Sequence, residues 1–395
     1  MARKILHLDL DAFFCSVEEI LDPSLVGKAF AVGGSPQGRG VIASCSYQAR
    51  KFGVRSAMPA GKALSLCPGL LFVHHQHHLY GEYSDKVMQI LEELTPLVQQ
   101  VSVDEAFLDV SDLLLPLLSI ATDLQKRVQD ELSLPCSIGG ATSKLVAKIA
   151  NDYGKASVQT GKAPRKITII PEGHEKDFLA PLDVQAMWGI GPKTSQKLHS
   201  LGVHTIGQMA ELSLAELSRF FGNGAQEIKE RSRGIDPSPV HSDHALKSVS
   251  NERTYREDTE DKTVMLQTLR SLSDQVGYRL RKANLAGSVV HLKLRYHDFT
   301  TFTRQTALDH CTNLDDEIYT EVKDLLEKNL LPNRAVRLLG VGVSGLDVPH
   351  RQLSLWGDPD IKKEQLTGAV DKLKEKYGKD IIKRGNMLKP PKEKP

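Results

Sequence analysis

Near its start the chain reads Lys4-Ile5-Leu6-His7-Leu8-Asp9-Leu10-Asp11-Ala12-Phe13-Phe14, a predicted apolar strand that carries two carboxylates and then two aromatic rings. Because side chains alternate along a strand, Asp9 and Asp11 should point to the same face of a sheet. Two carboxylates on one face repel each other unless a cation lies between them, and a divalent metal is the usual cation. Taken alone, this segment fits a metal site and, equally well, one helix-capping acid beside one surface acid.

A second acidic strand is predicted far along the chain, from Val101 to Val110, with Asp104 and Glu105 in its middle. Burying two carboxylates in an apolar strand costs several kcal/mol unless a metal or a buried cation compensates them. Together with Asp9 and Asp11, these acids supply enough oxygens for two hard cations. The pair of acidic strands therefore favours a metal site over purely structural carboxylates.

Composition places the chain among ordinary globular proteins, with 395 residues, 40% hydrophobic and 25% charged, and this length predicts roughly two to four domains. No apolar run is long enough to span a membrane, and no charged-then-apolar leader precedes the first strand, so we expect a cytoplasmic protein. The five scattered cysteines include no CxxC pair, which argues against a disulfide framework or a zinc site. A formal charge of +2 does not by itself indicate a nucleic-acid partner.

Cations follow a predicted strand at 41–47, where Arg50, Lys51 and Arg55 form a candidate phosphate contact or, equally well, a solvated helix face. Lys148 and Lys155 lie seven residues apart on a predicted helix that starts at Leu145, so they share one face if the helix reaches that far. The histidines at 74, 75, 77 and 78 are interpreted as surface residues, because their spacing does not match a metal site.

A helix-hairpin-helix is predicted around Trp188-Gly189-Ile190-Gly191-Pro192-Lys193. Glycines in such a hairpin let backbone N–H groups approach a phosphate without obstruction by side chains. The pattern indicates sequence-independent contact with a nucleic-acid duplex. A linker rich in Ser, Pro and Gly follows from Arg231 to His244.

A third unit from Lys247 to about Val348 is predicted as strand 247–257, helix 263–284, strands 287–297 and 300–308, helix 314–328 and strand 334–345. We interpret it as an α+β sandwich with a local basic surface. The candidates for that surface are Arg279, Arg281, Lys282, Lys293 and Arg295. Beyond it, Leu353, Leu355 and Trp356 form an apolar peptide typical of a docking element or, alternatively, of a segment folded back on the domain. A short basic helix is expected from Ile361 to Tyr377.

Taken together, these motifs resemble the Y-family translesion DNA polymerases, in the DNA polymerase IV branch. The resemblance rests on residues 5–14, 47–54, 102–109 and 144–150, on the hairpin at 188–193 and on Lys247-Ser248-Val249-Ser250. It implies an α+β right-hand fold with an antiparallel palm sheet. It also implies a division into palm (1–13 and 77–165), fingers (14–76), helix-hairpin-helix thumb (166–232), linker (233–246), little finger (247–348), and a clamp-binding peptide with a basic tail (349–395).

The resemblance also implies roles for single residues. Asp9, Asp104 and Glu105 are expected to be catalytic metal ligands for two Mg²⁺ ions, with the Leu10 carbonyl completing one site and Asp11 as a structural neighbour. Phe14 resembles the steric gate that excludes ribonucleotides. The nucleotide-binding set is Phe13, Phe14, Ser44, Tyr47, Arg50 and Lys155. The DNA-binding set is Gly189, Gly191, Lys193, Lys247, Ser248, Ser250 and Arg295. The clamp-binding set is Gln352, Leu353, Leu355 and Trp356.

The implied activity is template-directed DNA synthesis of low fidelity, without proofreading, on primer–template DNA with deoxynucleoside triphosphates. A replication sliding clamp is an expected partner, and the protein is expected to be a monomer without a membrane association. Trp356 stands where Phe is common, and 39 residues follow it, which leaves clamp binding open. Two alternatives are a noncatalytic DNA- and clamp-binding accessory and a helix-hairpin-helix nuclease. The first should have lost an acid, and the second should carry its acids near the hairpin.

Overall fold

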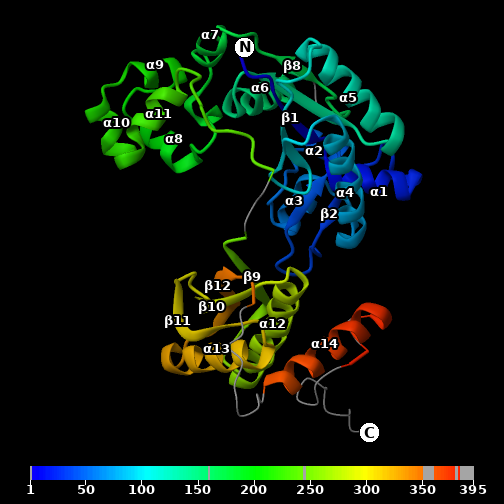
Figure 1. Ribbon diagram of the computed structural model, residues 1–395, viewed down its shortest axis with the longest axis vertical. Coiled ribbons are helices and arrows are strands. Elements are labelled where there is room, and N and C mark those ends of the chain that lie inside the picture. Colours follow the sequence, from blue (N-terminus) through cyan, green and yellow to red (C-terminus); the bar gives the residue numbers. More distant parts are fainter. Residues whose placement is uncertain (1, 159–160, 243–245, 350–359, 379–380, 383–395) are drawn as a thin grey trace. The chain divides into compact units, whose positions relative to one another are not determined.

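The computed structural model describes residues 2–158, 161–242, 246–349, 360–378 and 381–382. The chain divides into two compact units, residues 1–244 and 245–395 (Figure 1). Among the described residues, no helix combines the length and the hydrophobicity needed to cross a bilayer.

A five-stranded sheet with the order β5-β6-β1-β7-β8 forms the centre of the first unit. Its strands are β1 (Ile5–Leu10), β5 (Val98–Gln100), β6 (Glu105–Asp109), β7 (Cys136–Ala141) and β8 (Ile167–Ile169). The strands pair antiparallel except β7 and β8, which are parallel. The expectation of a purely antiparallel sheet is therefore wrong at one edge.

Strand β1 lies in the middle of this sheet and separates two hydrophobic layers. Leu6, Leu8 and Leu10 pack in one core with α4 (His77–Leu94) and α5 (Leu117–Leu132). The alternate residue Ile5 packs in a second core with α6 (Lys144–Ala156). Because the side-chain period of a strand is two residues, Asp9 lies on the α6 side of the sheet with Ile5.

Two smaller parts complete the first unit. A three-stranded sheet with the order β3-β2-β4 has its own core. Its strands are β2 (Phe30–Gly33), β3 (Ile42–Cys45) and β4 (Leu71–Val73), and the neighbouring helices are α1 (Phe13–Leu21), α2 (Tyr47–Lys51) and α3 (Ala60–Leu66). The helical part shares the core of α6 and consists of α7 (Glu175–Leu179), α8 (Pro192–His199), α9 (Ile206–Glu211), α10 (Leu214–Phe221) and α11 (Ala225–Arg231).

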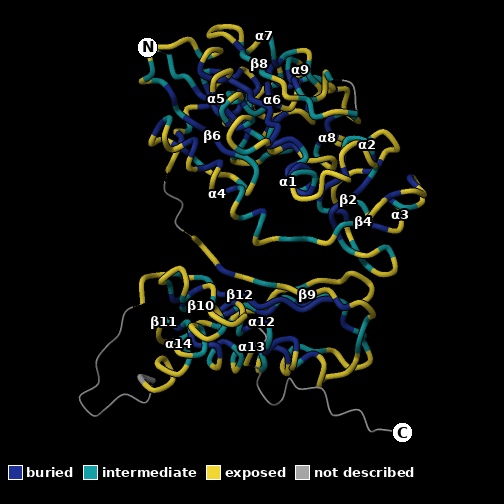
Figure 2. The backbone as a smooth tube through the Cα atoms, turned by 90° about the vertical axis from the view of Figure 1, so that its right-hand side faces the viewer, coloured by how far each residue is buried: buried dark blue, intermediate teal, exposed yellow. Residues whose placement is uncertain are grey.

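The second unit has a four-stranded antiparallel sheet with the order β11-β10-β12-β9. Its elements are β9 (Ser248–Thr259), α12 (Lys262–Lys282), β10 (Ala286–Tyr296), β11 (Thr301–Thr312), α13 (Asp315–Asn329), β12 (Val336–Asp347) and α14 (Asp360–Tyr377). Figure 2 shows buried residues running along the strands and along α12 and α13. The predicted α+β unit is confirmed, with its six elements in the predicted order.

Two predicted elements differ from the structure. Residues 101–104 form a turn rather than the start of a strand, so β6 begins at Glu105. The Ser102 hydroxyl holds this turn by accepting hydrogen bonds from the backbone N–H groups of Asp104 (3.2 Å) and Glu105 (3.0 Å). The linker predicted from Arg231 is also partly folded, because Asp236 and Val240 are buried and Asp236 accepts a hydrogen bond from the Leu145 N–H at the start of α6.

Candidate active site

Strand pairing brings the acids of β1 and β6 together. Asp9 lies directly opposite Glu105 in the register of the two strands, and directly opposite residues have Cβ atoms about 4.5–5.5 Å apart. The Leu10 N–H donates a 2.9 Å hydrogen bond to the Asp104 carbonyl, which continues the pairing by one residue. Residues almost a hundred positions apart in sequence are therefore neighbours at one end of the sheet.

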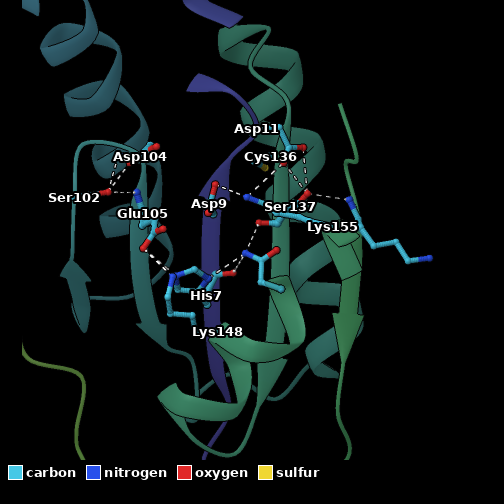
Figure 3. Close-up of polar contacts among 12 residues, drawn as sticks. His7, Asp9, Asp11, Ser102, Asp104, Glu105, Cys136, Ser137, Lys148 and Lys155 are labelled. Atoms are coloured by element: carbon cyan, nitrogen blue, oxygen red, sulfur yellow. Dashed lines mark hydrogen bonds and ion pairs between the residues drawn. The ribbon is translucent and has the colours of Figure 1, made fainter. Parts of the chain in front are cut away.

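Each carboxylate of this group has its own polar partner (Figure 3). Asp9 forms an ion pair with Lys155 from α6. Glu105 accepts a 3.1 Å hydrogen bond from Lys148, which also belongs to α6. Asp104 accepts a 2.5 Å hydrogen bond from the Ser102 hydroxyl. The predicted shared face of Lys148 and Lys155 is confirmed, since both lysines reach acids at this end of the sheet.

These partners set the protonation of the acids. Burial raises the pKa of Asp9 to about 7, although Lys155 pulls it down. The His7 ring, 3.6 Å away, and Lys148 hold the pKa of Glu105 well below its usual range. Burial lowers the pKa of His7 itself, so that its ring stays neutral near pH 7. A cation that lies next to a buried acid with a raised pKa favours the ionised form of that acid.

Asp11 has a different environment from Asp9. Its side chain is fully buried and accepts hydrogen bonds from the Ser137 hydroxyl (2.9 and 3.1 Å) and from the Arg165 N–H (2.9 Å). Lys155 lies 3.6 Å from it. Asp11 thus connects the end of β1 to β7 and to the segment before β8, in keeping with the expected structural role.

The acids fit a hard divalent metal in chemistry and in backbone position, but their side chains are turned toward other groups. In the part of the chain that the structure describes, no three His, Cys, Asp or Glu side chains form a group that could hold a metal ion. Carboxylate oxygens are nevertheless the ligands that hard cations prefer. The Lys155 ammonium already supplies a positive charge beside Asp9.

A cavity of about 410 Å³ opens beside these acids. It is lined by residues of β1, α1, α2 and α6 together with nearby loops. The predicted residues on its wall are Asp9, Leu10, Phe13, Phe14, Ser44, Tyr47, Arg50, Asp104 and Lys155. Glu105 is not among the lining residues, because its side chain points toward Lys148 and His7.

The two aromatic residues at the start of α1, Phe13 and Phe14, differ in how far they are buried. Phe13 is buried in the core, whereas Phe14 is partly exposed and faces the cavity. Between β1 and α1, Ala12 adopts the left-handed conformation with φ of 49°, which is uncommon for a residue with a Cβ atom. This sharp turn carries the chain from the end of β1 directly into the aromatic pair.

Cations and a phenol also line this cavity. The Arg50 guanidinium lies 4.5 Å from the centre of the Tyr47 ring, and its Nε donates a 3.2 Å hydrogen bond to the Cys45 carbonyl. Lining residues outside the predicted nucleotide-binding set include Arg55, Ser56 and Lys162. Ser56 and Lys162 carried no sequence signal, and only their position in space identifies them.

The predicted DNA-binding residues lie in two places. Gly189 has φ of +100°, and a Cβ atom at Gly189 or Gly191 would meet no atom within 4 Å. Only Gly189 therefore needs glycine for its conformation, while Gly191 leaves open space before α8, where Lys193 is exposed. The hairpin has the exposed backbone that the sequence predicts.

In the second unit a groove of about 470 Å³ runs over the sheet. Lys247, Ser248 and Ser250 line it, together with Lys293 and His291 from β10. Arg295 lies two residues beyond Lys293 on the same strand and donates a hydrogen bond to Thr301.

Two other predicted groups have different outcomes. Arg281, a candidate for the basic surface, is instead paired with Asp315 and Asp371. The predicted clamp-binding residues Gln352, Leu353, Leu355 and Trp356 lie outside the described residues.

Comparison with known proteins identifies the family. Residues 8–152 match the impB/mucB/samB family, residues 172–203 match the IMS family HHH motif, and residues 246–355 match the impB/mucB/samB family C-terminal domain. DNA polymerase IV of Dehalococcoides mccartyi strain 195 is 40% identical over 98% of both chains. DNA polymerase IV 1 of Bacillus subtilis strain 168 is 36% identical over 98% of this chain and 94% of its own.

Solved structures show the same fold. The Y-family DNA polymerase chimera Dbh-Dpo4(243-245)-Dbh superposes with a TM-score of 0.78 at 24% identity, covering 87% of this chain and 99% of its own. DinB from Sulfolobus solfataricus gives a TM-score of 0.60 at 24% identity, covering 88% of this chain and all of its own. From these matches and the full-length relatives, the chain belongs to the impB/mucB/samB family of Y-family DNA polymerases, in the group of DNA polymerase IV.

Proposed function

We propose that this polymerase extends a primer on a DNA template by nucleotidyl transfer with two Mg²⁺ ions. The observation that carries the proposal is the cavity beside β1, where Asp9 and Asp104 lie on the same wall as Phe14, Tyr47, Arg50 and Lys155. Acids and cations that line one cavity match a triphosphate that is attacked at its inner phosphate. The family implies a divalent metal, and the metal identity and the number of ions are part of the proposal.

The residues that would hold the metal are Asp9, Asp104 and Glu105, with the carbonyl of Leu10. When bound, a pair of divalent ions supplies an activated primer hydroxyl and charge neutralisation on the leaving pyrophosphate. For this arrangement Glu105 must leave Lys148, and Asp9 must leave Lys155. Each released lysine keeps its positive charge close to the reacting groups, since both come from the single helix α6.

The other cavity residues orient the nucleotide. Tyr47, Arg50 and Lys155 provide donors to the triphosphate, and Ser44 lies beside them. Phe14 presents its ring where a ribose 2′-hydroxyl would come, and Phe13 supports it from the core. The sheet groove of the second unit, with Lys247, Ser248 and Ser250, and the hairpin with Lys193 would contact the DNA backbone without reading its sequence.

We further propose low-fidelity synthesis past damaged template bases, without proofreading. The sequence offers no additional acidic cluster suited to an exonuclease. In this assignment the palm is 1–13 and 77–165, the fingers 14–76, the thumb 166–232, the linker 233–246 and the little finger 247–348, with the clamp peptide and tail at 349–395. Binding of a sliding clamp, a monomeric state and a cytoplasmic location stay predictions.

The test is primer extension with purified protein on undamaged templates and on a panel of damaged ones. We expect Mg²⁺-dependent extension on the undamaged template and insertion opposite at least one class of lesion. DNA binding without any extension would favour the noncatalytic accessory instead. Extension that stops before every lesion would support the polymerase and reject the translesion role.

A further inference from the structure

Helix α14 is attached to the second unit through its acidic side. The Arg281 guanidinium of α12 donates to both oxygens of Asp371, from Nε (2.7 Å) and from Nη2 (3.2 Å). The Tyr278 hydroxyl donates a 3.0 Å hydrogen bond to Glu375. Asp371 and Glu375 are four residues apart, so they lie on one face of α14.

Arg281 is itself held in place from the other side. Its Nη1 donates to the Asp315 carboxylate (2.8 Å) and to the Asn313 carbonyl (2.5 Å) at the start of α13. One guanidinium thus joins α12, α13 and α14. A bidentate contact of this kind fixes orientation as well as position, so the rotation of α14 about its own axis is determined.

This rotation leaves the apolar side of α14 facing outward. Leu366, Val370, Leu373 and Tyr377 follow one another at intervals of four, three and four residues, the spacing of a coiled-coil seam. Leu366 is 67% exposed, Leu373 is 41% exposed and Tyr377 is 58% exposed. At about 100° per residue, this seam lies on the opposite side of the helix from Asp371 and Glu375.

An amphipathic helix normally buries its apolar side against its own domain. Here the polar side makes the internal contacts, and the apolar side is left for something else. Figure 1 shows α14 beside α12 within the second unit, and the contacts with Arg281 and Tyr278 fix which side faces inward. The seam is therefore a candidate docking surface.

Charge on either side of the seam selects among possible occupants. Lys362, Lys374 and Lys376 flank it by helical position, and Asp371 and Glu375 are turned inward. Two copies of this helix would bring like charges together along the seam, which disfavours self-association. Contact with DNA phosphates alone would make no use of three exposed apolar side chains.

We propose that the seam of α14 docks an apolar helix or groove of another protein that is bordered by Asp and Glu side chains. Leucine and tyrosine supply the buried contact, and the three lysines select a partner with the opposite charge. No residue of the seam lines the nucleotide cavity or the sheet groove.

The test uses a designed helical peptide of about three heptads, with Leu at its a and d positions and Glu at its e and g positions. Its binding to the full chain is measured by fluorescence anisotropy. A matched peptide with Lys at the e and g positions is the control ligand. We expect the acidic peptide to bind and the basic peptide to bind at least about tenfold more weakly. Equal binding of the two peptides, or no binding of the acidic one, overturns the proposal.

Substitutions in the seam test whether the acidic peptide binds there. The double variant Leu366→Ser, Leu373→Ser should weaken binding of the acidic peptide at least about tenfold, whereas Leu118→Ser, an equally exposed leucine of α5, should leave it unchanged. Unchanged binding by the double variant overturns the proposal. In a Cys311→Ser background, Leu373→Cys should react rapidly with a maleimide, and slow reaction would mean that the seam is already buried.

Other occupants are excluded by two further measurements on the wild-type chain. Sedimentation velocity should give a monomer, and a dimer lost in the Leu366→Ser, Leu373→Ser variant would assign the seam to a second copy. Vesicles of phosphatidylglycerol and phosphatidylcholine should not bind through the seam. Vesicle binding that the double variant loses would assign it to a lipid surface.

Discussion

The rings of Phe14 and Tyr80 are stacked, with their centroids 4.4 Å apart and their planes 17° from parallel. Tyr80 is buried in α4, and its hydroxyl donates a 2.5 Å hydrogen bond to Glu18, which also accepts from Gln76. The orientation of Phe14 on the cavity wall therefore depends on a buried polar group behind it. A ring fixed in this way suits the proposed role of Phe14 in discriminating between sugars that differ by one hydroxyl.

Shortening Phe14 should remove that discrimination. We expect Phe14→Ala to lower the preference of kcat/KM for deoxynucleotides over ribonucleotides by tenfold or more, which corresponds to at least about 1.4 kcal/mol. Single-nucleotide incorporation with matched dATP and ATP measures the ratio. Phe52→Ala, which removes an exposed phenylalanine, is the control. An unchanged sugar preference in Phe14→Ala would remove the gate role.

Removing an acidic side chain from the cavity should abolish primer extension without weakening DNA binding. In Asp104→Ala we expect Mg²⁺-dependent primer extension to be lost while the affinity for primer–template DNA is retained, because Asp104 lines the nucleotide cavity and is not one of the predicted DNA-binding residues. Asp123→Ala, which removes an exposed carboxylate of α5, should extend at the wild-type rate. Extension by Asp104→Ala at the wild-type rate would show that this carboxylate does not hold a catalytic metal.

Periodicity alone was enough to predict the second unit, because alternating and helical patterns are local properties of the sequence. Periodicity did not predict the turn at 101–104, because the hydroxyl of Ser102 ends the strand pairing inside an apolar run. Arg281 was misinterpreted as a surface cation for a related reason. Its partners Asp315 and Asp371 lie 34 and 90 residues away, and only tertiary structure brings them to it.

The helix-hairpin-helix should contribute an electrostatic contact to DNA. We expect Lys193→Ala to weaken DNA binding equally for unrelated sequences and to reduce the slope of log Kobs against log salt by about one. Titrations at several NaCl concentrations measure the slope. Lys176→Ala, an exposed lysine of α7, should leave the slope unchanged. A sequence-dependent loss in Lys193→Ala would contradict backbone contact.

Burial should make most thiols of the folded protein unreactive. Cys15, Cys45, Cys67 and Cys136 are buried, and Cys311 is partly exposed. Burial raises the pKa of Cys15 to about 12 and also raises those of Cys45 and Cys136, so thiolate is scarce at pH 8. A DTNB assay should detect one fast thiol in the native protein and all five after guanidinium unfolding. A second fast thiol in the native protein would contradict this burial.

Close approach of α6 to β7 should depend on Gly139. A Cβ atom there would lie 1.9 Å from the Ala147 carbonyl oxygen and 2.6 Å from the Asn151 nitrogen, both backbone atoms of α6. We expect Gly139→Ala to lower the free energy of unfolding by about 2–3 kcal/mol. Urea unfolding followed by circular dichroism measures this loss.

The same substitution should also reduce activity, because α6 carries Lys148 and Lys155 to the acids of β6 and β1. A displaced helix moves both ammonium groups, so we expect kcat for primer extension to fall more than DNA affinity does. Gly81→Ala in α4 is the matched control. Its Cβ would meet no atom within 4 Å, and the change should stabilise the helix by up to about 1 kcal/mol. If Gly139→Ala were as stable and as active as Gly81→Ala, the packing of α6 on β7 would not position the two lysines.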